Sequence, residues 1–526
     1  MDSRGPGPSN SHAVSSPEVD ARPDAKLSSL ARHSLVYSIA PLAQRFIALV
    51  LVRYYTEALD KAQWGVTQIT DLLFTALIQI SGTNLLAGVV RFYFDQKDER
   101  DRKSVISSSL LLLSAVSWTL VGLGLLFRAP LSRFLFDTAD PRLAHDNLQL
   151  CLILSLLSIP LALSSETAFR YLQVQQRSTL ITTLKISKSF LEMSLRILFL
   201  LVLDWGIAGF LAATLVGELL TSLLIGGWVL SRVGLTFSWR VLRPMVAYSV
   251  PLVMVGLCQM GLNYFDRLLL RQLGPQDEKM GWVGIYGQGY LVGWLVQLVV
   301  VGSFMQIWQP WIFGVKEPER QKDLIRRVST WALFAVGSAS IAVMLLGREL
   351  VHALSGSPEY WDAFPVVPWV CAGYVFFALN GLSQVPMFIA KRTWPMFWLN
   401  VVAVAVKVLL SVVLIRSHGY VGAAMATLAT FMVLGTAGHW IAVRTVGARF
   451  EHGRMLAMLS LVLAAMGAAL WIDGRWTSGY TALLTPYTAL KGGLILLSLG
   501  VVWGGLLERD ERGECLRALR AKLGRR

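Results

Sequence analysis

The chain has 526 residues, of which 54% are hydrophobic and only 15% are charged. A soluble protein of this length would need a far more polar surface, so most of the chain must have lipid as its solvent. The formal net charge of +15 could point to nucleic acid in a soluble protein. Here the cations occupy alternate loops between apolar runs, which argues against nucleic acid as a partner.

The chain begins with a segment rich in Ser, Pro and charge, which predicts a disordered cytoplasmic tail over residues 1–32. Apolar runs of roughly 20 to 25 residues follow, long enough to cross about 30 Å of hydrocarbon as helices. A first lobe, residues 33–230, holds six helices at about 33 to 54, 66 to 90, 107 to 127, 148 to 170, 180 to 203 and 207 to 230.

A second lobe, residues 243–444, holds six helices at about 243 to 270, 282 to 308, 328 to 348, 364 to 390, 394 to 416 and 420 to 444. A final pair at about 455 to 472 and 484 to 507 occupies residues 455–507. The predicted fold class is therefore an all-α integral membrane protein with about fourteen transmembrane helices. A basic cytoplasmic tail closes the chain at residues 508–526.

The distribution of charge in the loops supports this count. Lys and Arg concentrate in alternate segments, including Arg91 to Lys103, Arg232 to Arg243, Lys316 to Arg327, Arg444 to Arg454 and the C-terminal tail. Cytoplasmic loops carry such an excess, so both termini are predicted to be cytoplasmic. All the loops are short and leave no room for a soluble catalytic domain, so we expect a protein that is not an enzyme.

Cysteine usage gives no sign of a redox or metal centre. Cys151, Cys258, Cys371 and Cys515 are widely separated, which favours neither a disulfide framework nor a metal site. No phosphate-binding loop or nucleophile motif is present. We therefore expect neither a metal nor a cofactor, apart from a proton or sodium ion that could drive a transport cycle.

The two lobes contain an internal repeat. The run that opens with Gly206-Ile207-Ala208-Gly209 and continues to Ala213-Thr214-Leu215 matches the run from Gly419 through Gly422 to Ala426-Thr427-Leu428, at an offset of about 213 residues. Trp64-Gly65-Val66 matches Val283-Gly284-Ile285 at about 218. Six helices separate equivalent positions, so the repeat is parallel, as in transporters built from two related halves.

A family resemblance enters at the seventh helix, where Asn263-Tyr264-Phe265-Asp266-Arg267 leads to Val283-Gly284-Ile285-Tyr286. This pattern resembles polysaccharide transporters of the multidrug/oligosaccharidyl-lipid/polysaccharide (MOP) exporter superfamily, which carry an Asp-Arg pair late in this helix and then Gly-x-Tyr. The resemblance implies two six-helix lobes around a V-shaped central cavity. It also implies a flippase for undecaprenyl-pyrophosphate-linked oligosaccharides in the bacterial inner membrane, for O-antigen, exopolysaccharide or capsule synthesis.

The implied partners follow from that resemblance. They are the lipid-linked oligosaccharide, membrane lipids, and a polymerase and chain-length regulator of the same pathway. The two-lobe design needs no second copy, so a monomer is expected.

Ionisable residues within membrane helices are functional candidates because charge in hydrocarbon is costly. Arg45 lies in the middle of the first helix and is the leading candidate to grip a phosphate; the alternative is a structural pair with Asp71. Asp266 and Arg267 are further candidates, although adjacent side chains on a helix point about 100° apart.

The fifth helix carries a charged stripe of Lys185, Lys188, Glu192 and Arg196, spaced by three and four residues. Lys185 and Lys188 are predicted either to bind substrate or to form a structural ladder with Glu192. Gln259, Asn263 and Gln297 suit a wall that binds sugar, although hydrogen bonding between helices would also explain them. Candidates for taking up a coupling ion are Asp71, Glu166, Glu218 and Asp266.

Three other functions remain open. A lipid II flippase would share fourteen helices and a cationic cavity, but such proteins crowd arginines into the first two helices. A multidrug exporter of the same superfamily would favour twelve helices. A membrane-embedded polysaccharide polymerase would need a larger outer loop than the segments near residues 128–147 and 349–363 provide.

Overall fold

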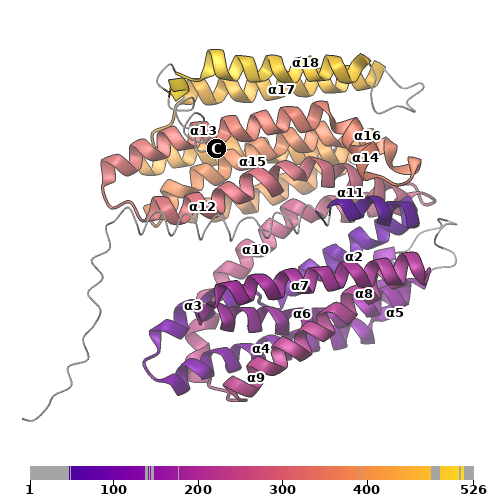
Figure 1. Cartoon of the computed structure of the whole chain (residues 1–526), viewed down its shortest axis with the longest axis vertical. Coiled ribbons are helices and arrows are strands. Elements are labelled where there is room, and N and C mark those ends of the chain that lie inside the picture. The colour runs from indigo at the N-terminus through magenta and orange to yellow at the C-terminus, as the bar shows by residue number, and fades with distance from the viewer. Residues whose placement is uncertain are drawn as a thin grey trace, which may run out of the picture.

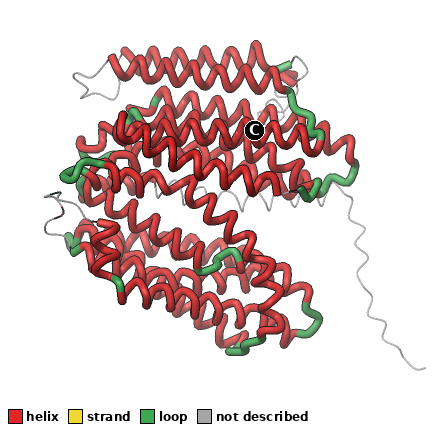
Figure 2. The backbone as a smooth tube through the Cα atoms, turned by 180° about the vertical axis from the view of Figure 1, so that it is seen from behind, coloured by secondary structure: helices red, strands yellow, loops and turns green. Residues whose placement is uncertain are grey.

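The structure is a computed structural model of the whole chain, and it describes residues 47, 49–136, 140, 143, 147–175, 177–392, 394–475, 486–508 and 511–513. Within these residues the chain is helical, with short connecting loops and no β-strand (Figure 2). The predicted N-terminal tail, most of the first helix, and most of the basic C-terminal tail lie outside the described residues.

The first half begins with a helical stretch that reaches residue 58. The labelled helices follow it. They are α2 (Lys61–Ile80), α3 (Leu85–Asp95), α4 (Glu99–Leu126), α5 (Arg128–Phe136), α6 (Leu148–Val174), α7 (Ser178–Ile197) with a π-helical end (Leu198–Val202), α8 (Gly206–Thr221), a π-helical turn (Ser222–Gly226) and α9 (Gly227–Val233).

The second half begins with α10 (Trp239–Leu273), α11 (Lys279–Val296), a π-helical turn (Gln297–Val301), α12 (Gly302–Phe313) and α13 (Pro318–Leu345). It continues with α14 (Gly347–Leu354), a 3-10 turn (Pro358–Ala363), α15 (Val366–Ile389) and α16 (Trp394–Val446). The last pair is α17 (His452–Arg475) and α18 (Pro486–Val501), which ends in a π-helical turn (Val502–Leu506).

These helices account for the predicted membrane spans. Among the described residues, 10 helical stretches are long and apolar enough to span a membrane. One of them, α16, is two helices that meet at Gly419. The remaining spans are three. They are the first helical stretch, α2 together with α3, and α7 together with its π-helical end. The chain is therefore a multi-pass membrane protein of about fourteen spans.

The second predicted helix differs from its expectation. Instead of one helix over about 66 to 90, α2 and α3 are separated by a turn at Ser81 to Asn84, where Gly82 has a φ of 91°. A positive φ is easy only for glycine, so the turn occurs where the chain has one. The spans from α4 onward match their predicted positions within the described residues, and α4, α10 and α13 extend further into the loops.

The helices form two lobes with a third layer on one side. Helices α2 to α9 pack into one lobe, and α11 to α16 form the other, while α10 runs obliquely between them (Figure 1). The lobes lie close together at the end where α2 and α11 begin, and they separate toward the end of α12, which gives the expected V shape. Helices α17 and α18 cover the second lobe on the side of α13.

The internal repeat has the same backbone geometry in both halves. Gly206 and Gly419, each at the start of the repeated run, have φ values of 56° and 60°. Three residues later, a Cβ built at Gly422 would lie 1.9 Å from the carbonyl oxygen of Leu414. The repeated glycines therefore make tight hairpins between the fifth and sixth spans and between the eleventh and twelfth.

The second repeated motif forms the closed end of the V. A Cβ built at Gly65 would lie 2.0 Å from the carbonyl oxygen of Met280, and one built at Gly284 would lie 1.9 Å from that of Lys61. Only glycine lets the backbones of α2 and α11 approach this closely. Beside this contact, Lys61 Nζ lies 3.3 Å from Glu278 Oε1.

The loop around α14 also contributes to the closed end. The Tyr360 hydroxyl donates to the carbonyl oxygen of Leu59 at 2.7 Å, and the backbone N–H of Gly356 donates to Thr56 Oγ1 at 2.9 Å. This loop belongs to the second lobe, and the residues it contacts belong to the first. The two lobes are therefore joined by hydrogen bonds as well as by the contact between α2 and α11.

The pair α17 and α18 is attached to the second lobe by a buried cation. Lys491 of α18 has no exposed side-chain surface, and its Nζ lies 2.8 Å from Asp473 Oδ1 of α17 and 3.0 Å from both carboxylate oxygens of Glu349 on α14. A buried ammonium requires such partners, so the ion pairs fix the position of the pair.

Candidate functional site

A cavity of about 560 Å³ lies between the lobes, below the closed end. Its walls come from the first helical stretch, α2, α7, α8, α10, α11 with its π-helical turn, and α15. The lining combines three charged residues, five amides and a set of aromatic rings: Asp71, Arg196 and Arg267; Gln68, Gln79, Gln259, Asn263 and Gln297; Tyr55, Trp64, Phe210, Tyr264, Tyr290, Trp294, Tyr374 and Phe377.

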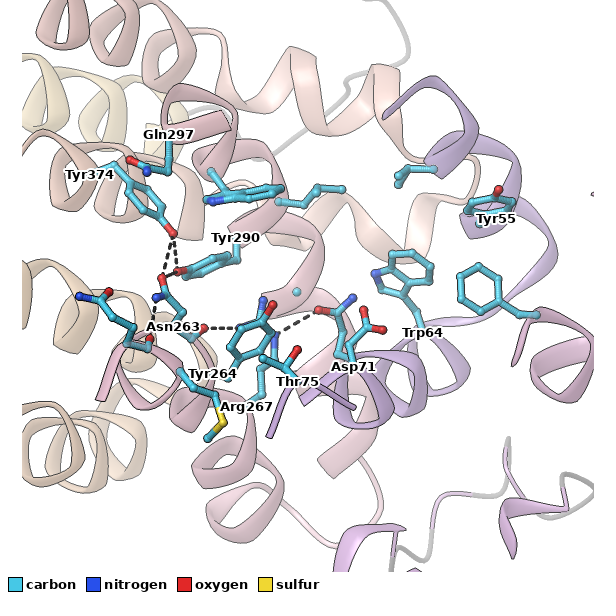
Figure 3. Close-up of a pocket in the computed structure, with 18 of the residues that line it drawn as sticks. Tyr55, Trp64, Asp71, Thr75, Asn263, Tyr264, Arg267, Tyr290, Gln297 and Tyr374 are labelled. Atoms are coloured by element: carbon cyan, nitrogen blue, oxygen red, sulfur yellow. Dashed lines mark hydrogen bonds between the residues drawn. The ribbon is translucent and has the colours of Figure 1, made fainter. Parts of the chain in front are cut away.

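One wall is a hydrogen-bonded group of an amide and two tyrosines (Figure 3). The hydroxyls of Tyr290 and Tyr374 are 2.6 Å apart, and they lie 3.4 and 3.5 Å from Asn263 Oδ1. The Asn263 amide donates to the carbonyl oxygen of Gln259 at 2.7 Å. These contacts order polar groups and ring faces along the cavity, which is the chemistry that binds hydroxyl-rich ligands.

Arg267 presents its guanidinium to the same cavity from α10. Its Nε donates to Gln68 Oε1 at 3.1 Å, and its Nη1 donates to the carbonyl oxygen of Asn263 at 2.7 Å. The guanidinium lies 5.0 and 4.7 Å from the ring centres of Tyr264 and Tyr290. Cation–π contacts and these hydrogen bonds hold the charge in place between the lobes.

The first lobe contributes Arg196 from α7 and Asp71 from α2. Arg196 Nη2 donates to Thr214 Oγ1 at 3.1 Å, and the guanidinium lies 4.4 Å from the ring centre of Phe210. Asp71 is exposed within the structure, and it lines the cavity. Cations of this kind can bind phosphate oxygens in the bidentate geometry that guanidinium favours.

Asp266 lies behind this wall and does not line the cavity. Its carboxylate and the ammonium of Lys407 are both fully buried, with Nζ 3.0 Å from Oδ2. The hydroxyl of Tyr286 also donates to Oδ2. Although adjacent helix positions diverge, Arg267 folds back, and its Nη1 lies 3.5 Å from Asp266 Oδ1. Asp266 is thus saturated by protein donors.

A smaller cavity of about 200 Å³ lies inside the first lobe and shares Asp71, Arg196 and Phe210 with the larger one. Glu192 and Glu218 line it. Lys188 Nζ lies 2.7 Å from Glu218 Oε1 and 3.7 Å from Glu192 Oε1, so this part of the charged stripe forms a ladder within the lobe.

The structure brings together five of the residues predicted to bind substrate, namely Asp71, Gln259, Asn263, Arg267 and Gln297. It places Asp266 behind the wall. Lys185 and Lys188 lie outside the cavity in ion pairs, Lys185 with Glu166 at 3.4 Å. Arg45 and its alternative pairing with Asp71 lie outside the described residues. The binding roles of these residues remain predictions.

Several lining residues were not proposed from the sequence. Arg196 was recognised only as one end of the charged stripe, although it is the residue of that stripe that reaches the larger cavity. Tyr55, Gln68, Gln79 and Tyr374 carry no sequence signal that separates them from other polar residues in membrane helices.

The fold of the chain is similar to that of several solved transporter structures, including two described as members of the MOP superfamily. The lipid II flippase MurJ in an inward closed conformation matches with a TM-score of 0.67 and 13% identity, over 90% of this chain and 100% of the other. An inward-facing multidrug resistance MATE family transporter matches with a TM-score of 0.64 and 14% identity, over 78% and 98%.

A MOP superfamily transporter from Pyrococcus furiosus matches with a TM-score of 0.56 and 14% identity, over 78% of this chain and 94% of that one. At these identities the likeness concerns the fold. Residues 30–316, more than half of the chain, match the family described as polysaccharide biosynthesis protein. The chain belongs to this family. No curated protein sequence matches the chain.

Proposed function

We propose that the protein is a flippase that moves undecaprenyl-pyrophosphate-linked oligosaccharides from the cytoplasmic to the outer face of the bacterial inner membrane. The observation that carries the proposal is the cavity between the lobes, where two arginines lie among amides and aromatic rings. Family membership directs the proposal toward polysaccharide synthesis. The products would be O-antigen, exopolysaccharide or capsule.

The composition of the cavity fits the two chemical parts of such a substrate. A diphosphate needs cations, and Arg196 and Arg267 are the basic residues that line the cavity among the described residues. Sugars need hydrogen-bonding amides and ring faces, which Asn263, Tyr290 and Tyr374 provide. The prenyl tail would remain in lipid while the head group occupies the cavity.

The V shape fits alternating access, in which the lobes rock about a central site. Under the topology predicted from the loop charges, the closed end at Gly65 and Gly284 faces the outside, and the cavity opens toward the cytoplasm. The cycle would need no cofactor, although a proton or sodium ion could drive it. A polymerase and a chain-length regulator would take the product from a monomeric transporter.

The experiment that tests the proposal is gene deletion, followed by measuring on which membrane face the lipid-linked oligosaccharide accumulates. We expect cytoplasmic accumulation that the wild-type gene reverses and Arg196→Gln does not. Lys185→Gln is the matched control because Lys185 lies on the same helix but pairs with Glu166 away from the cavity. Normal delivery of the oligosaccharide in the deletion strain would refute the proposal and favour a multidrug exporter.

Lipid II is a second candidate substrate because the match to the lipid II flippase covers nearly the whole chain. Against it, the second span, formed by α2 and α3, carries only one arginine, Arg91. Depletion experiments separate the two substrates. Cell lysis would indicate lipid II, whereas loss of surface polysaccharide in viable cells would indicate the oligosaccharide. A chain-length assay on the accumulated glycolipid would distinguish transport from polymerisation.

A further inference from the structure

A buried cation lies next to the cavity without lining it. Lys407, in the first half of α16, and Asp266, in α10, are 141 residues apart in the chain and have no exposed side-chain surface. Lys407 Nζ lies 3.0 Å from Asp266 Oδ2 and donates to Thr427 Oγ1 at 2.6 Å. Two buried charges at this separation interact far more strongly than they would in water.

Asp266 divides its two oxygens between different partners. Oδ2 accepts from Lys407 and from the hydroxyl of Tyr286. Oδ1 accepts from the backbone N–H of Arg267 at 2.9 Å, while the guanidinium Nη1 of Arg267 is further away, at 3.5 Å. The ammonium is thus the better placed of the two cations to compensate the carboxylate.

Arg267 keeps part of its hydrogen-bonding capacity for the cavity. Its Nε and Nη1 are used by Gln68 and by the carbonyl oxygen of Asn263. Within the part of the chain that the structure describes, Nη2 has no hydrogen-bond partner. A guanidinium held in this way can donate to an anionic ligand without being reoriented.

The charge of the wall depends on Lys407. Asp266, Arg267 and Lys407 together carry one excess positive charge, whereas Asp266 and Arg267 alone would be neutral. The first lobe contributes Asp71 and Arg196 to the cavity, one charge of each sign. Without Lys407, the excess positive charge of these five groups would therefore disappear.

We propose that Lys407 determines the specificity of the cavity for anionic head groups, because it compensates Asp266 and so leaves the charge of Arg267 available to a diphosphate. This inference rests on the proposed function, since it concerns the phosphate part of the same substrate. Lys407 acts through Asp266 and does not touch the ligand.

The test compares two ligands that differ only in charge and head group, farnesyl diphosphate and farnesol. Full-length protein in lipid nanodiscs is titrated with each, and the fluorescence of Trp64 and Trp294, which line the cavity, reports binding. We expect the wild type to prefer the diphosphate. In Lys407→Met the preference for the diphosphate should fall about tenfold, because the variant loses an electrostatic attraction for the charged ligand. The affinity for farnesol, which is uncharged, should not change.

Three variants control for damage to the fold. Lys407→Arg keeps the charge and should keep most of the preference. Lys491→Met removes another fully buried lysine, which lies in α18 and does not line the cavity, and should leave the preference unchanged. Lys407→Met combined with Asp266→Asn removes both charges of the pair, so it avoids an unpaired buried carboxylate and should restore the preference.

Each outcome decides between explanations. Equal losses for both ligands, or a preference that survives in Lys407→Met, would refute the role of Lys407 while leaving the proposed function intact. Failure of the double variant to restore a lost preference would indicate a structural effect. If the wild type bound both ligands equally, the diphosphate part of the proposed function would fail, and this inference with it.

Discussion

Thr214 and Thr427, 213 residues apart at equivalent positions of the repeat, each accept a hydrogen bond from a cation on the preceding span. Arg196 donates to Thr214 at 3.1 Å, and Lys407 donates to Thr427 at 2.6 Å. The surroundings of the cation differ between the two lobes. Arg196 reaches the cavity, whereas Lys407 is fully buried against Asp266.

This difference predicts unequal costs for the same substitution. Thr427→Val removes an acceptor from a buried ammonium, which should lower the free energy of unfolding by about 1–3 kcal/mol. Thr214→Val should cost less, because Arg196 lies beside a cavity in which water can replace the hydroxyl. Thermal unfolding of the two variants in the same detergent measures the difference. Equal losses would contradict this account of the repeat.

The contact between Gly65 and Gly284 predicts that a single methyl group opens the closed end. In Gly65→Ala or Gly284→Ala the new Cβ would meet a carbonyl oxygen within about 2 Å, so α2 and α11 must separate. Spin labels at Glu57 and Ser357 should report a longer distance between the lobes than in the parent protein. Gly500→Ala, where a Cβ would meet nothing within 4 Å, is the control. An unchanged distance would mean that the closed end adapts without separation.

The ion pairs of Lys491 predict that the accessory pair α17 and α18 detaches when the cation is removed. Lys491→Met leaves Asp473 and Glu349 without their shared partner, and breaking a buried pair costs about 3–5 kcal/mol. Hydrogen exchange should increase in α14, α17 and α18 but not in α2. Leu496→Met, at a position of α18 that is 72% exposed, should have no such effect. Exchange that rises uniformly over the chain would instead indicate general destabilisation.

The loop around α14 predicts sensitivity to acid. Burial and then the charge of Arg348 lower the pKa of His352 below its ordinary value, and its ring stacks on Trp361 with centres 4.2 Å apart. The unfolded chain therefore takes up the proton first, and the folded state loses stability as the pH falls below about 6.5. His352→Phe keeps a ring stacked on Trp361 and should remove the loss of stability that is due to protonation of His352. Melting temperatures of both proteins between about pH 7.5 and 5.5 test it; parallel curves would exclude His352.

Much of the fold could be predicted from the sequence because lipid imposes a length on every helix. The spans, the two lobes and the parallel repeat follow from hydropathy and from glycine spacing. The turn between α2 and α3 could not be predicted, because Ser81 to Asn84 look like a polar patch of a continuous helix. Its cause is a backbone conformation at Gly82 that composition does not reveal.

The candidate site was only partly predictable, because hydropathy does not say which helix faces the cavity. Arg267 and Asn263 were found through a motif, whereas Arg196 required knowing that the end of α7 reaches the interface between the lobes. Nor could pairs between distant helices be assigned. Lys407 and Asp266 lie 141 residues apart, and the sequence offers several other partners for each.

The burial of Lys407 also constrains how the protein enters the bilayer. A lysine at the centre of a membrane helix costs about 2.5–3.5 kcal/mol during translocon-guided insertion. Lys407 lies near the middle of the eleventh span, and its partner Asp266 belongs to the seventh, which is synthesised earlier. The eleventh span carries no acidic residue of its own at that depth, so it is a poor substrate for insertion alone. Biogenesis of the second lobe is therefore a cooperative step that is completed only when the eleventh span meets the seventh.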